Sequence, residues 1–231
     1  SGLSLELQSI IPPPPFRMGD NVHTMPDHTV YKPLILPSAH LFAEEVPAPG
    51  FIGSSSMRRA GLFLAEVFRL NKETENFRFF SPDETYSNKL NAIFQATTRS
   101  FVWPHMDHDE DLARTGRVIE MLSEHSLQGL LQGYILTGRH GVFPSYEAFM
   151  PIVSSMTDQY AKFIRVARKI PWRGHVASLN YILTSPGWAQ EHNGFSHQNP
   201  GFIDSVLQKH TSFVHVYFPP DRNTTLVVLK K

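Results

Sequence analysis

The sequence of 231 residues contains no cysteine. This absence excludes disulfide bonds, zinc sites built on thiolates and cysteine nucleophiles, and a reducing compartment is compatible with it, so we expect a cytoplasmic protein. No apolar run approaches the roughly 20 residues that a membrane-spanning helix needs. Lys plus Arg and Asp plus Glu both number 21, so no net charge favours nucleic acid or an anionic membrane as a partner.

Proline is distributed unevenly, since half of the 18 prolines fall within residues 1–54. Proline fixes φ and lacks the amide donor, so this stretch cannot form a continuous helix or a central strand. It is typical of an extended arm that wraps a neighbouring surface or of a linker, and we favour the linker. We expect residues 55–231 to form one α/β domain, truncated at its C-terminal end.

The apolar spacing after residue 54 alternates between helical and strand-like segments. Helices are predicted over residues 57–68, 90–101, 127–135, 146–163 and 201–209, strands over 77–80, 118–122, 177–184 and 213–218, and either type over 224–229. This alternation predicts a mostly parallel sheet with helices on both faces. Ligands of such sheets bind at the carboxyl ends of the strands. We therefore expect the chemistry in the loops at residues 81–88, 123–125 and 185–197.

Glu124 stands where a buried strand gives way to a helix. Taken alone, it is typical of an acid that the helix dipole stabilises at an N-terminus. Gly129 and Gly133 lie on one stripe of that helix, and each costs roughly 1 kcal/mol relative to alanine. Such glycines indicate that another backbone or a flat ligand comes close.

Two polar segments could carry chemistry. Residues 192–198, His-Asn-Gly-Phe-Ser-His-Gln, follow a predicted strand and favour a binding site, although a structural loop remains open. Residues 105–111 are rich in histidine and acids, which suggests a metal-dependent hydrolase as one hypothesis. The segment lacks the spacing and the glycine of a calcium loop, so we favour a solvated acidic loop there.

Several motifs in fixed order resemble the middle region of phosphoketolases, from about Met57 to the end of the chain. They are Pro82-Asp83-Glu84-Thr85, Ser87-Asn88-Lys89-Leu90, Ser123-Glu124-His125, residues 136–141 (Leu-Thr-Gly-Arg-His-Gly), residues 145–149 (Ser-Tyr-Glu-Ala-Phe), Pro171-Trp172-Arg173 and residues 192–201. The glutamate followed by histidine also resembles the wider thiamine-diphosphate family, including transketolase. The His-Asn-Gly-Phe run favours phosphoketolase.

The resemblance implies an enzyme that cleaves xylulose 5-phosphate or fructose 6-phosphate with inorganic phosphate, giving acetyl phosphate and an aldose phosphate. It implies thiamine diphosphate and Mg²⁺ as cofactors, with a buried Glu124 sharing a proton with the aminopyrimidine ring, a state that burial favours. The roles it implies for other residues are cofactor binding by Tyr146, Phe149 and Asn193, substrate or phosphate binding by Ser87, Arg168 and Gln190, and catalysis and substrate binding by His197.

The sequence also departs from this family. Asn199 replaces the usual aspartate, and no Gly-Asp-Gly motif for magnesium and the diphosphate is present. We therefore expect a fragment that is inactive alone, with the metal ligands on the diphosphate-binding domain of the full-length enzyme, in a homo-oligomer. The alternatives are a non-catalytic binding or assembly module with the same fold and another transketolase-like enzyme.

Overall fold

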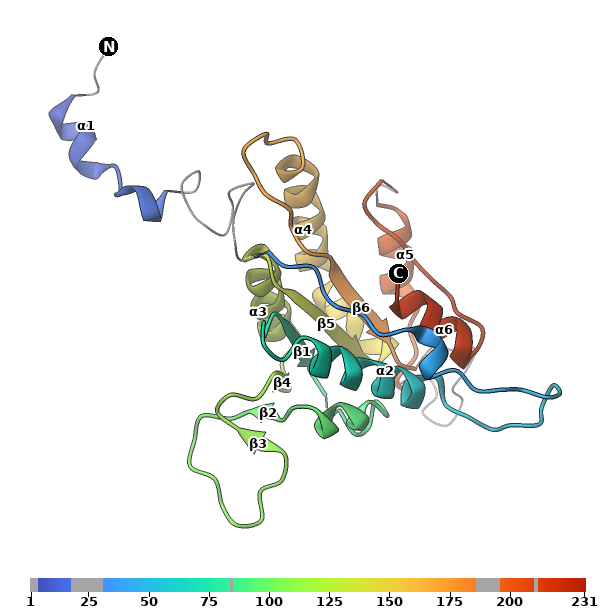
Figure 1. The fold of residues 1–231 in the computed structure, drawn as a ribbon. Coiled ribbons are helices and arrows are strands. Elements are labelled where there is room, and N and C mark those ends of the chain that lie inside the picture. Colours follow the sequence, from blue (N-terminus) through green and yellow to red (C-terminus); the bar gives the residue numbers. More distant parts are fainter. Residues whose placement is uncertain (1–3, 18–30, 84, 186–195, 210–211) are drawn as a thin grey trace.

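A computed structural model describes residues 4–17, 31–83, 85–185, 196–209 and 212–231 (Figure 1). The strands are β1 (Phe77–Ser81), β2 (Arg99–Ser100), β3 (Leu112–Ala113), β4 (Val118–Glu120), β5 (His140–Ser145) and β6 (Leu179–Leu183). The α-helices are α1 (Leu5–Ile10), α2 (Ser56–Leu70), α3 (Glu124–Leu136), α4 (Ser154–Ala167), α5 (Gly201–Leu207) and α6 (Arg222–Leu229). The short 3₁₀ segments are η1 (Pro14–Phe16), η3 (Ala39–Leu41), η4 (Asn91–Gln95) and η5 (Glu147–Val153).

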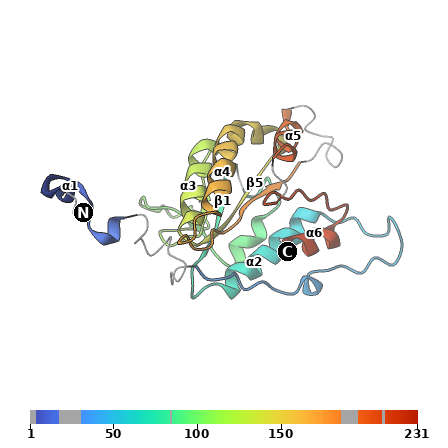
Figure 2. The same ribbon diagram turned by 90° about the horizontal axis from the view of Figure 1, so that it is seen from above.

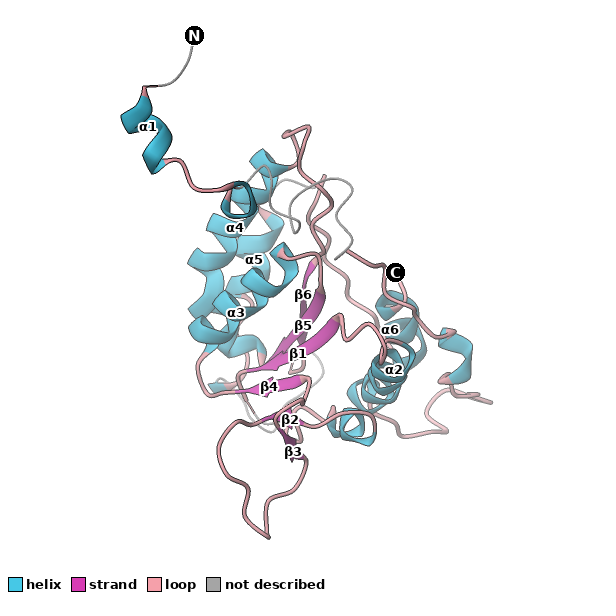
Figure 3. Cartoon of the chain, turned by 60° about the vertical axis from the view of Figure 1, so that its left-hand side comes forward, coloured by secondary structure: helices cyan, strands magenta, loops and turns pink. Residues whose placement is uncertain are grey.

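The six strands form one sheet in the order β3-β2-β4-β1-β5-β6, and every pair in it is parallel. Helices α2 and α6 cover one face, and α3, α4 and α5 cover the other (Figures 2 and 3). The predicted α/β class is therefore confirmed. No helix among the described residues is long and apolar enough to cross a bilayer.

A hydrophobic core lies on each face of the sheet, and strand β1 contributes side chains to both, because side chains alternate between the two faces of a strand. Phe77 and Phe79 pack with α2 and α6, while Phe80 packs with α3 and η5. All three phenylalanines are at most 4% exposed. Burying a side chain of this size stabilises the fold by about 1.5–3 kcal/mol. The sheet thus holds both helical layers through one central strand.

Two predicted helix boundaries follow from identifiable residues. Ser55, in the run Ser54-Ser55-Ser56, caps α2 by accepting a hydrogen bond from the Arg58 amide. After α3, Gly138 adopts a left-handed φ of 84°, which ends the helix. A Cβ at Gly138 would also lie 3.1 Å from the backbone of Tyr31, so glycine is required there for two reasons.

Three sequence predictions of secondary structure are wrong. Residues 90–101 form η4 and the edge strand β2 instead of one helix, because Arg99 enters the parallel ladder beside Leu112 and Val118. The helix predicted over 146–163 is divided into η5 and α4, because Pro151 has no amide hydrogen to donate. Residues 213–218 form no strand, since no described strand pairs with them.

Residues 31–45, which we call the strap, run from the C-terminal end of α3 to α6 (Figure 1). The side chain of Asn71 donates to the Ile35 carbonyl (2.9 Å) and accepts from the Ile35 amide (3.0 Å). Asn223 forms the same double contact with the backbone of Glu44, at 2.9 and 3.0 Å. Leu34, Leu36, Ala39 and Phe42 pack against the core between α2 and the sheet. The strap therefore packs on the α/β domain, while the division of the chain at residue 54 remains a prediction.

Candidate active site at the carboxyl ends of the strands

The parallel topology brings the segments that follow β1, β4, β5 and β6 to one edge of the sheet. Glu124, Tyr146 and Ser87 all lie in such segments. Two of the three predicted functional loops, at residues 81–88 and 123–125, are therefore neighbours in space, because β1 and β4 are paired. Of the third, only its two ends are described, and Gln190 and Asn193 lie outside the described residues.

Glu124 is the first residue of α3, with Ser123 as the N-cap. The Ser123 hydroxyl accepts a hydrogen bond from the Ser126 amide at 3.4 Å, which orients the start of the helix. Among the described residues, no group forms a hydrogen bond or an ion pair with the Glu124 carboxylate, and the side chain is only partly buried. The described residues thus do not provide the burial that the resemblance implies, and they leave the carboxylate available to a ligand.

Tyr146, Phe149 and His197 form an aromatic cluster beyond the end of β5. The His197 ring lies edge-on to Tyr146 at 4.9 Å and to Phe149 at 5.7 Å between ring centroids. The two phenyl rings are 6.1 Å apart. These separations are typical of favourable aromatic pairs. Three residues that the resemblance implies in one site are therefore in mutual contact.

The backbone of His197 is held to the loop after β5. Its carbonyl accepts hydrogen bonds from the Ser185 hydroxyl at 2.9 Å and from the Ala148 amide at 3.3 Å. Its ring nitrogen Nδ1 lies 2.6 Å from the hydroxyl of Ser196, which fixes the orientation of the imidazole. The contacts explain how a residue far along the chain reaches Tyr146.

The 85–90 loop, which follows β1, contacts the aromatic cluster. Its Ser87 carbonyl accepts a hydrogen bond from the Tyr146 hydroxyl at 3.3 Å. The Ser87 hydroxyl donates a hydrogen bond to a carboxylate oxygen of Asp83 at 3.3 Å. Asn88 is 1% exposed, and its amide oxygen accepts a hydrogen bond from the Thr184 hydroxyl at the end of β6. The loop is therefore fixed to the ends of both β5 and β6.

Arg168 is not brought to this cluster. It follows α4, so it lies near the amino end of β6, which begins at Leu179. Its guanidinium donates to the Ser212 carbonyl at 3.2 Å and lies 5.9 Å from the Phe213 ring. These contacts give Arg168 a structural partner on the opposite edge of the sheet.

Glycines 129 and 133 do not meet another backbone. A Cβ at Gly133 would have no described atom within 4 Å, and one at Gly129 would touch only the Met156 methyl at 3.9 Å. Both are exposed on α3. The expected close backbone approach is therefore wrong for the described residues.

The acidic loop at residues 105–111 is solvent-exposed over residues 105–110, as predicted. No group of three histidine, aspartate or glutamate side chains is placed to hold a metal ion in the part of the chain that the structure describes. The hypothesis of a metal-dependent hydrolase therefore receives no support from this loop.

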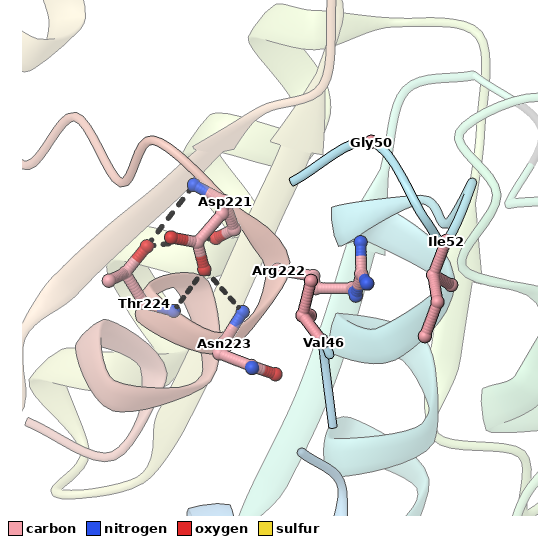
Figure 4. Close-up of a pocket in the computed structure, with 7 residues that line it drawn as sticks. All are labelled: Val46, Gly50, Ile52, Asp221, Arg222, Asn223 and Thr224. Atoms are coloured by element: carbon pink, nitrogen blue, oxygen red, sulfur yellow. Dashed lines mark hydrogen bonds between the residues drawn. The ribbon is translucent and has the colours of Figure 1, made fainter. Parts of the chain in front are cut away.

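Away from the candidate site, a cavity of about 420 Å³ lies between the residues after the strap and the start of α6 (Figure 4). It is lined by Val46, Gly50, Ile52 and residues 221–224. Asp221 accepts hydrogen bonds from the amides of Asn223 and Thr224, which caps α6 and lowers the pKa of the Asp221 carboxyl. The acid is thus engaged in helix capping, and none of the predicted site residues lines the cavity.

Sequence reasoning missed Glu120 and Arg99, which form an ion pair at 2.8 Å beside the candidate site. The sequence carried only a weak signal, because Glu120 lies inside the predicted strand 118–122, whereas in the structure it is the last residue of β4, where side chains of a site gather. Thr85, within the Pro82-Asp83-Glu84-Thr85 motif, donates a hydrogen bond to the Glu120 carboxylate at 3.2 Å. This contact depends on the order of the strands and could not be inferred from spacing.

A parallel sheet covered by helices, with the candidate residues at the carboxyl ends of the strands, defines this chain as an α/β domain. Residues 58–231 match the model of the D-xylulose 5-phosphate/D-fructose 6-phosphate phosphoketolase family. The chain therefore belongs to the phosphoketolase family, as the motifs predicted.

Named relatives agree with this assignment. The chain is 52% identical over 221 residues to a "Probable phosphoketolase" of Bradyrhizobium diazoefficiens, an alignment that covers 96% of this chain and 28% of the relative. It is 49% identical over 226 residues to a "Probable phosphoketolase" of Nitrosospira multiformis, covering 98% and 28% respectively. A "Probable phosphoketolase 2" of Nostoc is 48% identical over 223 residues, covering 96% and 28%. The chain thus spans little more than a quarter of the length of these curated relatives.

Proposed function

We propose that this chain is part of a phosphoketolase that cleaves xylulose 5-phosphate or fructose 6-phosphate with inorganic phosphate. The products are acetyl phosphate, an aldose phosphate and water. Beyond family membership, the observation that carries this proposal is the contact of Tyr146 and Phe149 with His197, beside the loop that bears Ser87. An aromatic wall with a histidine suits a flat heterocycle and a polar substrate that meet at one point.

Thiamine diphosphate is the cofactor that we propose for this site, with Mg²⁺ held by residues outside this chain. The residues present fit the aminopyrimidine half of the molecule, since the Glu124 carboxylate has no described partner and an aromatic cluster lies on the same edge of the sheet. Bound thiamine diphosphate supplies a carbon nucleophile and an electron sink. Glu124 would hold a proton at the pyrimidine ring, and Tyr146 and Phe149 would pack against that ring, with Asn193 nearby.

The substrate roles that we propose follow from position. His197 would move a proton at the sugar or its cleavage product, because its ring is fixed beside the aromatic cluster. Ser87 and Gln190 would bind the sugar or inorganic phosphate. Arg168 would reach a phosphate only if the substrate extended past the sheet, since its guanidinium donates to the Ser212 carbonyl near the amino end of β6. The full site would be completed by a diphosphate-binding domain in a cytoplasmic homo-oligomer.

The test uses the full-length enzyme that contains this chain and measures acetyl phosphate formed from xylulose 5-phosphate, thiamine diphosphate, Mg²⁺ and inorganic phosphate. We expect Glu124→Gln to lower kcat by about 100-fold or more, since a positioned proton donor contributes 10²–10⁴-fold. The matched control is Glu66→Gln, which removes the charge of the exposed Glu66–Arg69 pair on α2 and leaves kcat unchanged.

Two outcomes would contradict the proposal. A full-length enzyme that forms no acetyl phosphate would favour a non-catalytic binding or assembly module. An enzyme that transfers a two-carbon unit between sugars and ignores inorganic phosphate would favour another transketolase-like activity. The isolated chain of 231 residues should show no turnover.

A further inference from the structure

The carboxylate of Glu120 connects three segments at the edge of the sheet that bears the candidate site. Glu120 is the last residue of β4. Its Oε2 accepts a hydrogen bond from Nε of Arg99 on β2 at 2.8 Å and another from the Thr85 hydroxyl at 3.2 Å. Thr85 is completely buried at the start of the 85–90 loop, and the side chain of Glu120 is 15% exposed.

Besides its ion pair with Glu120, the guanidinium of Arg99 contacts two aromatic rings. It lies 4.3 Å from the centroid of the Phe94 ring and 5.7 Å from that of Tyr86. These two rings are stacked, with centroids 5.5 Å apart, and the Tyr86 hydroxyl donates to Asp111 at 3.1 Å. An arginine fixed by rings loses little further side-chain entropy in an ion pair, so the bond to Glu120 is stronger than an exposed surface pair.

The 85–90 loop links Glu120 to the candidate site, because Thr85 contacts Glu120 and other residues of the loop contact the aromatic cluster and the end of β6. The Ser87 carbonyl accepts from the Tyr146 hydroxyl, and Asn88 accepts from Thr184. On the other side of Glu120, the Met121 amide donates to the Ser81 carbonyl at 3.1 Å, three residues before Glu124. Glu120 therefore stands between the turn that presents Glu124 and the loop that contacts Tyr146.

From these contacts we propose that Glu120 is a positioning residue of the active site, an inference that rests on the function proposed above. Through Thr85 and Arg99, it fixes the distance between the 85–90 loop and the start of α3. It does not touch substrate or cofactor. Misplacement of a reacting group by about 1 Å costs on the order of 100-fold in rate, so a loosened loop reduces turnover without removing a catalytic group.

The test compares three variants of the full-length enzyme. Glu120→Leu removes both acceptor oxygens at similar size and should lower kcat/KM for xylulose 5-phosphate by about 30-fold, mainly through kcat. Glu120→Gln keeps one acceptor oxygen for Arg99 and Thr85 and should restore activity to within about 5-fold of the unaltered enzyme. The control, Glu66→Leu on α2, removes an exposed pair with Arg69 (3.0 Å) and should leave kcat/KM within 2-fold.

A double-mutant cycle separates positioning from general destabilisation. Thr85→Val removes the hydroxyl at constant volume, and its loss of kcat/KM should not add to that of Glu120→Leu, because both break the same contact. A lower unfolding midpoint for Glu120→Leu, with kcat/KM within 2-fold of the unaltered enzyme, would overturn the inference and leave an ordinary structural ion pair. Additive losses would overturn it as well.

A second measurement keeps the two proposals distinguishable. Amide hydrogen exchange in peptides covering residues 85–90 should be at least about 10-fold faster in Glu120→Leu than in Glu66→Leu, since loops open locally when their anchors are lost. If the unaltered enzyme forms no acetyl phosphate, the proposed function fails, and the exchange rate alone decides whether Glu120 holds the loop. Equal exchange in both variants would overturn the inference.

Discussion

The strap and the carboxyl edge of the sheet differ in how their polar groups are satisfied. The backbone of the strap pairs with two side-chain amides of the domain: Asn71 and Asn223 each donate one hydrogen bond to it and accept another. The side chain of Glu44 in the strap forms ion pairs with Arg59 and Arg222. At the carboxyl edge, the Glu124 carboxylate has no partner among the described residues, and Leu122 beside it is 88% exposed.

This difference indicates separate uses for the two regions. A buried polar group without a partner costs about 1–3 kcal/mol, so pairing in the strap serves stability. An unpaired carboxylate next to an exposed apolar side chain adds little to the stability of this chain, and both groups are suited to contact with a ligand or another domain. Substitutions in the strap should therefore change the free energy of unfolding, and those at the edge should change activity.

The largest change in stability should come from Asn71→Ala. Asn71 is 1% exposed, and it pairs with both backbone groups of Ile35 and with the Val67 carbonyl. We expect the free energy of unfolding to fall by about 2–4 kcal/mol in urea denaturation, because these groups lose their partners. Asn91→Ala is the control, since the Asn91 side chain forms no hydrogen bond among the described residues. Equal shifts for both variants would show that the strap contact contributes nothing specific.

A pair of glycine substitutions should have effects of opposite sign. Gly138→Ala should destabilise the chain by about 1–2 kcal/mol, because φ is +84° and the new Cβ would lie 3.1 Å from the Tyr31 backbone of the strap. Gly133→Ala on the open face of α3 should stabilise it by about 0.5–1 kcal/mol. Thermal unfolding of the two variants side by side tests the contrast, and effects of the same sign would contradict it.

Acidification should weaken the strap through His140. Burial lowers the pKa of His140 below its ordinary value of 6.5, against the opposing effect of its bond to the Lys32 carbonyl at 2.8 Å. Protonation therefore favours the unfolded chain, so this stability is present above about pH 6.5 and is lost as the pH falls below it. The Tyr31 ring lies between two histidines, with its centroid 5.6 Å from that of His140 and 5.8 Å from that of His175.

The measurement is the free energy of unfolding at pH 8 and pH 5.5 for the unaltered chain and for His140→Gln, which can still donate to the Lys32 carbonyl. The variant should lose less stability than the unaltered chain between the two pH values. An identical loss in both would exclude His140 as a source of the pH dependence.

The smallest effect on stability should come from Glu124→Ala. Without a described partner, its carboxylate contributes to the chain only through the N-terminus of α3, so the free energy of unfolding should change by less than about 0.5 kcal/mol. Urea denaturation of the isolated chain measures this. A loss above about 1 kcal/mol would show that Glu124 stabilises this chain and would break the distinction between strap and edge.

Local patterns predicted the elements that are long and amphipathic. α2 and α3 appear where helical spacing placed them, and β1, β4 and β6 appear where apolar runs placed them. β5 was missed because Gly141 and Pro144 lie inside it, and both residues weaken a strand pattern. Strands of two residues, such as β2, carry too few side chains for a period to show.

The candidate site was predicted only in part. Motif order placed Glu124, Tyr146 and His197 in one site, and the structure brings Tyr146 and His197 into contact. It separates Arg168, because α4 carries that residue to the other edge of the sheet. In a parallel sheet, a helix that follows a strand ends at the amino edge of the sheet, so the position of Arg168 after α4 places it away from the site.

The sequence by itself determined the α/β class, the order of the motifs and the family to which the chain belongs. These follow from residue identity and short-range spacing, which remain visible without coordinates. Only the tertiary structure decided that the strap packs on the domain and that Glu120 joins Thr85 to Arg99. Those contacts link residues 21 to 179 positions apart. They exist because β4 lies between β1 and β2 and because a buried side-chain amide can pair with a distant backbone.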